Sequence, residues 1–211
     1  MNELRLYKTA FGLALFTIIF NIAEGLFSTF FGYEDESLAL FGFGLDSFIE
    51  VISGLGIAHM ILRIRRNPEG TRDNFERTAL KITGASFYIL FIGLVITSIY
   101  NMWTGHMPVT TFWGVVISMI SIVIMIILVM WKRKVGRKLN SEPVLADANC
   151  TLICIYMSVI LLISSGIYEI FKIPYIDSVG TLGLAYFAFT EGKEAFEKAK
   201  SDKYCSCDHN K

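Results

Sequence analysis

Residues 38 to 62 read LALFGFGLDSFIEVISGLGIAHMIL, an apolar segment interrupted by two carboxylic acids, Asp46 and Glu50. The hydrocarbon core of a bilayer is about 30 Å thick, and an α-helix needs roughly 20 mostly apolar residues to cross it. This segment is longer than that and contains neither Lys nor Arg. It therefore predicts a transmembrane helix that carries two acidic side chains inside the membrane.

The rest of the chain has the same character. Of its 211 residues, 54% are hydrophobic and 18% are charged, and the mean hydropathy is +0.53; soluble chains average about 25% charged residues. Further apolar segments of spanning length occur at 11–31, 82–102, 112–131, 144–167 and, less clearly, 175–196. We therefore expect an all-α polytopic membrane protein, with a six-helix domain over residues 1–200 and a cytoplasmic tail over residues 201–211.

Charge and cysteine content exclude several other classes of protein. The formal net charge is +0, so no overall positive field favours nucleic acid as a partner. Four cysteines in two clusters are too few for a disulfide-stapled secreted domain. We expect the lipid bilayer to be the main environment of the chain.

The basic residues predict how the bundle is oriented. Eighteen of the nineteen Lys and Arg residues lie before the first segment, between the second and third, between the fourth and fifth, or at the end of the sixth and beyond it. The third of these groups begins at Lys132, the last includes Lys198, and only Lys172 lies in the loops on the other side. Because cytoplasmic loops are enriched in Lys and Arg, we expect both termini to be cytoplasmic and the protein to lie in the cell, or inner, membrane.

Four ionisable side chains lie well inside the predicted helices: Glu24, Asp46, Glu50 and Asp147. Such a residue costs about 2.5 to 3.5 kcal/mol on insertion scales, so each one needs a reason. The apolar segments contain no Lys or Arg at comparable depth, so buried ion pairs cannot be the general explanation. The remaining candidates for neutralising these acidic side chains are a metal cation and bound protons.

Two pairs of side chains come to similar depths in the membrane. Asp46 and Glu50 are four residues apart, as are Cys150 and Cys154, so each pair shares one face of its helix. Counting from the cytoplasmic boundary, we place the carboxylates roughly 18 and 12 Å deep and the thiols roughly 9 and 15 Å deep. Two carboxylates and two thiols suit a tetrahedral divalent transition metal. The alternatives are close helix packing for the small cysteines and hydrogen-bonded, protonated side chains for the carboxylates.

Other polar residues have supporting roles in this scheme. We expect Glu24 and Asp147 to lie behind the metal ligands or to carry protons. The tail residues Cys205, Cys207 and His209 form a candidate site for metal capture, with an incidental tail as the alternative.

The sequence around these residues resembles the cation diffusion facilitator family. Ser37–Glu50 (SLALFGFGLDSFIE) is similar to the second transmembrane helix of that family, and Leu145–Cys154 (LADANCTLIC) is similar to the fifth. Both family helices carry paired ligands four residues apart, and Asn21–Gly25 and Ile176–Gly180 resemble parts of its first and sixth helices. The chain departs from the family by placing cysteine at both fifth-helix positions, and it resembles the truncated members without a cytoplasmic C-terminal domain.

The resemblance implies a transporter rather than an enzyme. The expected activity is movement of a divalent transition metal, zinc first, with cadmium, cobalt, iron or manganese as alternatives. The family implies efflux in exchange for protons by a homodimer, with the metal as transported substrate and no prosthetic group. The alternatives are a membrane scaffold or regulator that does not transport and, less favoured, a membrane thiol oxidoreductase. Cysteines four apart on a continuous helix are poorly placed for a disulfide.

The distribution of basic residues yields the first testable prediction. A reporter that is active only outside the cytoplasm, fused after Lys211, should give no signal, because an even number of membrane crossings returns the C-terminus to the cytoplasm. The same reporter inserted into the loop at residues 105–111 is the positive control. A strong signal from the C-terminal fusion would contradict the six-crossing topology.

Overall fold

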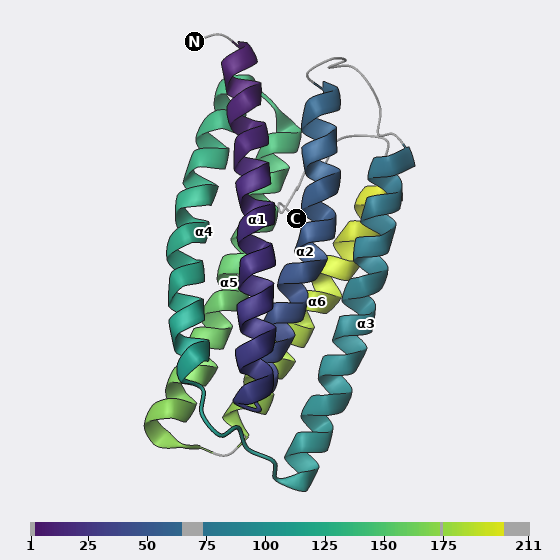
Figure 1. The fold of residues 1–211 in the computed structure, drawn as a ribbon. Helices are drawn as coiled ribbons and strands as arrows, with labels where there is room; N and C mark the ends of the chain where they lie inside the picture. The colour runs from purple at the N-terminus through teal and green to yellow at the C-terminus, as the bar shows by residue number, and fades with distance from the viewer. Residues whose placement is uncertain (1–2, 65–73, 174, 201–211) are drawn as a thin grey trace, which may run out of the picture.

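The structure is a computed structural model that describes residues 3–64, 74–173 and 175–200. Six α-helices form one up-and-down bundle (Figure 1): α1 (Glu3–Glu34), α2 (Leu38–Ile64), α3 (Asn74–Thr104), α4 (Phe112–Leu139), α5 (Glu142–Phe171) and α6 (Ile176–Lys200). The described residues contain no β-strand. The predicted all-α, six-helix fold is therefore confirmed.

The helices extend beyond the apolar segments from which they were predicted. The fourth helix continues to Leu139 instead of ending at residue 131, and the sixth continues to Lys200. Our placement of Lys132 in a loop and of Lys198 beyond the last helix was therefore wrong. Hydropathy detects only the apolar part of a helix, whereas Lys, Arg and Glu are good helix formers that prolong it.

Surface composition identifies an integral, multi-pass membrane protein. Five helices, α1 to α5, are long and apolar enough to cross a membrane. Large apolar side chains point outward from the bundle, with Ile19 59%, Ile89 73% and Ile96 61% exposed. A water-soluble bundle would bury such residues, whereas a bilayer solvates them. The sixth helix is less apolar and packs against α3 and α5 as part of the same bundle.

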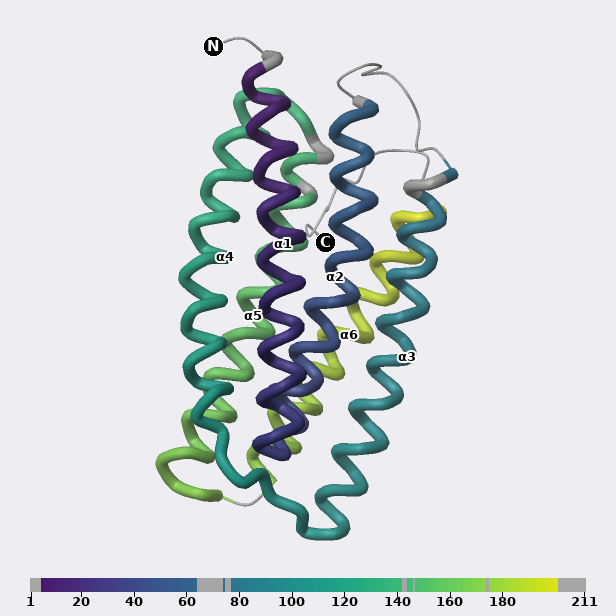
Figure 2. The backbone as a smooth tube through the Cα atoms, viewed as in Figure 1, coloured from purple at the N-terminus to yellow at the C-terminus, as the bar shows by residue number. Residues whose placement is uncertain are grey.

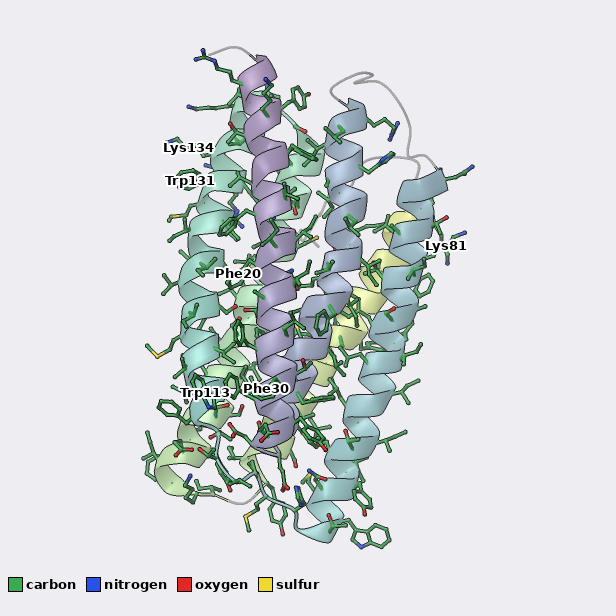
Figure 3. The ribbon with its side chains drawn as sticks, viewed as in Figure 1. Phe20, Phe30, Lys81, Trp113, Trp131 and Lys134 are labelled. Atoms are coloured by element: carbon green, nitrogen blue, oxygen red, sulfur yellow. The ribbon has the colours of Figure 1, made fainter. Side chains whose placement is uncertain are left out.

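We call the end at which α1 begins and α6 ends the upper end, as drawn in Figure 1, and the opposite end the lower end. Figure 3 shows Lys81 and Lys134 near the upper end, with Phe30 and Trp113 towards the lower end. The structure thus gathers basic residues from separate helices at one end, as the topology prediction assumes.

Three helix pairs make the most extensive contacts: α1 with α2, α3 with α6, and α4 with α5. In the first pair, a Cβ atom at Gly44 would lie 2.6 Å from the backbone nitrogen of Thr29, and one at Gly32 would collide with the backbone of Phe41. Only glycine permits this approach. The close crossing brings the polar residues of α1 next to Asp46 and Glu50 of α2.

A tight turn joins α4 to α5 at the upper end. Asn140 ends α4 in the left-handed conformation (φ 46°, ψ 38°), and the amide of Ser141 donates a hydrogen bond to the carbonyl oxygen of Gly136. Such a turn satisfies the last carbonyls of the helix and starts the next helix at once. The polar upper part of α4 therefore lies directly against the start of α5.

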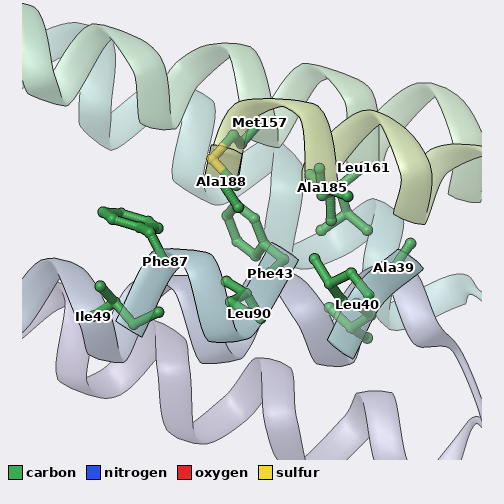
Figure 4. Close-up of a cluster of buried hydrophobic side chains, with 12 residues drawn as sticks. Ala39, Leu40, Phe43, Ile49, Phe87, Leu90, Met157, Leu161, Ala185 and Ala188 are labelled. Carbon is green, nitrogen blue, oxygen red and sulfur yellow. The ribbon is translucent and has the colours of Figure 1, made fainter. Parts of the chain in front are cut away.

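The lower end is closed by hydrogen bonds and apolar packing. The Asp177 carboxylate on α6 accepts hydrogen bonds from the Ser37 hydroxyl (2.6 Å) and the Leu38 amide (2.9 Å), and so caps the start of α2. Figure 2 shows the α3–α4 connection crossing this end, where the amide of Val109 donates to the carbonyl oxygen of Asp35 (2.9 Å). Figure 4 shows the adjoining core, in which Phe43 and Met157 are fully buried.

Candidate functional site

A cavity of about 60 Å³ lies in the upper half of the bundle. Side chains of α1, α2, α3, α5 and α6 line it, and among them are Asn21, Glu50, Cys150, Cys154, Glu191 and Lys198. The apolar core of the lower half lies beyond its floor. This core includes Phe43, Leu161 and Leu184, and none of these three side chains lines the cavity.

Glu50 occupies the floor of the cavity and joins three helices. The Cys154 thiol donates a hydrogen bond to Glu50 Oε1 (2.7 Å), and the Asn21 amide donates one to Oε2 (2.8 Å). The expected meeting of α2 and α5 at this depth is therefore observed for Glu50 and Cys154. A carboxylate that receives a thiol hydrogen is arranged for exchange between a proton and a metal ion, because metal binding requires a deprotonated thiol.

Two further carboxylates lie deeper in the bundle. Asp46 is only 2% exposed, and its Oδ1 atom has no hydrogen-bond partner. Glu24 is 6% exposed; its Oε2 accepts a hydrogen bond from the Ser47 hydroxyl (3.0 Å), while Oε1 has no partner. Buried polar atoms without partners are rare in folded proteins and need an explanation. These oxygens could accept a proton or contact a cation.

Cys150 faces the upper part of the same cavity. The Lys198 ammonium lies 3.3 Å from its sulfur and 2.5 Å from Glu194 Oε1. Sequence reasoning missed this contact because it ended the sixth helix too early. The extra turn of α6 carries Lys198 back to the fifth helix.

Asp147 lines the cavity and also forms an ion pair with Lys132. Lys132 is 1% exposed, and its ammonium lies 2.9 Å from Asp147 Oδ1 and 2.9 Å from the hydroxyl oxygen of Thr151. A buried ion pair therefore accounts for Asp147, although the sequence indicated no Lys or Arg at comparable depth. The α4–α5 turn makes the two residues neighbours, although they are fifteen positions apart.

The four candidate ligands are only partly assembled. Glu50 contacts Cys154, and Cys150 lines the same cavity, whereas Asp46 lies one helical turn below Glu50 and is not among the lining residues. Among the residues that the structure describes, no three or more His, Cys, Asp or Glu side chains are grouped closely enough to hold a metal ion. Full coordination therefore requires the side chains of α2 and α5 to move closer together.

Three candidate residues lie outside the described part of the chain, and two residues of the cavity were not predicted from the sequence. The tail residues Cys205, Cys207 and His209 are outside the described residues. Asn21 and Glu191 line the cavity but were not predicted as site residues. Spacing along the chain gives no signal of the contact between Asn21 and Glu50, because the glycine-mediated crossing of α1 and α2 brings them together.

Comparison with known protein families matches this chain to a family of membrane proteins. Residues 13–202 match the model of the cation efflux transmembrane domain. The match covers all of α2 to α6 and most of α1, including every residue discussed above for the cavity.

The Lys132–Asp147 pair yields a second prediction. Lys132→Met should lower the free energy of unfolding by about 3 to 5 kcal/mol, because it leaves Asp147 buried without its counter-ion. Adding Asp147→Leu should restore most of the lost stability. Thermal unfolding in detergent measures both effects, with exposed Lys134→Met as the matched control. Equal stability of the Lys132→Met and Lys134→Met variants would contradict the assigned pair.

Proposed function

The chain belongs to the cation efflux family, and we propose that it exports a divalent transition-metal ion from the cytoplasm in exchange for protons. Membership confirms the predicted family and makes the protein a carrier of metal cations across a membrane, rather than a member of an enzyme family. The ion, the exchange for protons and the direction are our proposal. Zinc is the first candidate, and cadmium, cobalt, iron and manganese are the alternatives.

The observation that carries this proposal is the contact between Glu50 and Cys154 at the floor of the cavity. The thiol hydrogen lies between the Cys154 sulfur and a Glu50 oxygen, and thiolate sulfur and carboxylate oxygen are both common ligands of divalent metal ions. A divalent cation that binds both atoms takes the place of this proton. Cation loading and proton release are then one event, and return of the empty carrier requires the proton again.

The balance of charge supports a cationic substrate. Glu24, Asp46 and Glu50 form no ion pair with Lys or Arg in the described parts of the chain. Three ionised carboxylates in a low-dielectric bundle would repel one another strongly. A divalent ion relieves this repulsion when it is bound, and protons relieve it when it is not.

The ligand chemistry narrows the choice of ion. Thiolates favour soft or borderline ions, whereas carboxylates favour harder ones, so a mixed set suits zinc and cadmium better than manganese. We propose Asp46, Glu50, Cys150 and Cys154 as the ligands. We propose that Glu24, which accepts a hydrogen bond from the Ser47 hydroxyl, carries a proton behind Asp46.

The direction follows from combining the cavity with the predicted topology. The cavity occupies the upper half of the bundle, and the capped α2 start and the apolar core close the lower half. If the upper end faces the cytoplasm, the described conformation receives its cation from the cytoplasm. Release requires the apolar core around Phe43 to separate while the upper half closes.

Transport by the purified protein in liposomes tests this proposal. Wild-type protein should move zinc and cadmium down a concentration gradient while protons move the opposite way, as followed by a metal dye and a pH dye. Asp46→Asn and Glu50→Gln should each lower the metal flux at least tenfold, because each keeps its size but loses its negative charge. Glu197→Gln, at an exposed position paired with Lys193, is the matched control.

Two outcomes would count against the proposal. Normal metal flux in the folded Asp46→Asn protein would remove Asp46 from the ligand set. Metal flux in the wild-type protein without proton movement would leave a metal transporter but contradict the exchange.

A further inference from the structure

The upper part of α6 presents charged groups to the cavity. Glu191, Glu194 and Lys198 are three and four residues apart, which places them along one face of the helix. Glu191 and Lys198 line the cavity together with Glu50 and both cysteines. The ligand set proposed above comes from α2 and α5 and leaves this charged face of α6 unexplained.

The position of Lys198 is unusual for a lysine near a helix end. Its side chain is only 13% exposed, whereas that of Lys193, five residues earlier, is 66% exposed. A long basic side chain normally extends to water. Here the ammonium is directed inward, between Glu194 Oε1 at 2.5 Å and the Cys150 sulfur at 3.3 Å.

Lys198 therefore occupies the space around a proposed ligand atom. A divalent ion bound at 2.3 Å or so from the Cys150 sulfur would lie within a few ångströms of this ammonium. Two cations that close repel each other, and the repulsion is weakly screened inside the bundle. The two positive charges cannot both remain at Cys150.

We propose that Lys198 is a tethered counter-ion, which the incoming divalent cation must displace from Cys150 to reach the site. This inference rests on the proposed transport function. In the cation-free state the ammonium supplies positive charge to a cavity lined by Glu50 and Glu191. When the cation arrives, Lys198 moves away from Cys150 and keeps its contact with Glu194.

This arrangement sets a minimum affinity that a cation must have to enter the site. A cation that binds weakly fails to displace the lysine, whereas a tightly bound divalent ion succeeds. The lysine also returns to Cys150 after the cation has left, so that the empty cavity keeps its charge balance. Lys198 thus lowers the affinity for the cation and favours its release.

Three variants test the role of Lys198 by cation binding. Calorimetric titration of the detergent-purified protein with cadmium should show about tenfold tighter binding for Lys198→Met than for the wild type, as expected for removal of one nearby charge. In liposomes the same variant should have a lower KM and a lower kcat. Lys198→Arg, which keeps the charge, should restore both values, and Lys193→Met should match the wild type.

A double-mutant cycle separates displacement from a merely structural role. Glu194→Gln removes the carboxylate that holds the ammonium of Lys198 once it has left Cys150. It should therefore weaken cadmium binding in the wild-type background and have little effect in the Lys198→Met background. An equal effect in both backgrounds would show that Glu194 acts on the cation directly and would overturn the proposal. Size-exclusion profiles confirm that each variant is folded.

The failures of the two proposals are distinguishable. If the wild type binds and transports cadmium but Lys198→Met binds it with equal or lower affinity, the counter-ion role is wrong and the transport proposal stands. If the wild type binds and transports neither zinc, cadmium, cobalt, iron nor manganese, the proposed function fails, and the role of Lys198 fails with it.

Discussion

The rest of this structure depends on three carboxylates inside an apolar bundle, Glu24, Asp46 and Glu50, which form no ion pair with a lysine or arginine among the described residues. Glu50 accepts hydrogen bonds from Asn21 and Cys154, and Glu24 accepts one from Ser47. One oxygen of Glu24 and one of Asp46 have no hydrogen-bond partner. Such a site is expensive to maintain and is stable only when protons or a cation neutralise it. Its instability as a set of free anions is what makes the exchange of a metal ion for protons physically reasonable.

The helix packing serves this site. Glycines at positions 32 and 44 let α1 and α2 approach closely, which brings Asn21 and Glu24 to the acidic face of α2. The tight turn at Asn140 places α5 against α4, where the buried Lys132–Asp147 pair holds the upper part of α5. At the lower end, the Asp177 cap fixes the start of α2. The carboxylate-bearing α2 is therefore anchored at the lower end, away from the site, whereas the cysteine-bearing α5 is anchored at Asp147, one turn before Cys150.

Much of this could be predicted from the sequence, because the membrane restricts the possible folds. Six helices, the meeting of Glu50 with Cys154 and the gathering of basic residues at one end all follow from hydropathy, helix periodicity and depth. The Lys132–Asp147 pair was missed because the hydropathy criterion ended the fourth helix at residue 131, where its continuous apolar run stops. That criterion does not detect a helix that continues through Lys and Arg residues. Counting outward from the two-residue turn would have found the pair.

Lys198 and Asn21 illustrate a different limit. Their contacts with Cys150 and Glu50 depend on which helices are neighbours and how closely they cross, and periodicity along one helix contains no such information. The incomplete gathering of the four candidate ligands is also a three-dimensional property. Asp46 lies below the cavity, although its four-residue spacing from Glu50 puts both side chains on the same face of α2.

The central claim is that one cation is held by carboxylates of α2 and thiols of α5 at the same time. X-ray absorption at the zinc edge of the zinc-loaded protein tests this most directly, because sulfur and oxygen neighbours scatter at different distances. We predict two sulfur atoms at about 2.3 Å and two oxygen atoms at about 2.0 to 2.2 Å. A shell of oxygen and nitrogen atoms without sulfur would contradict the account.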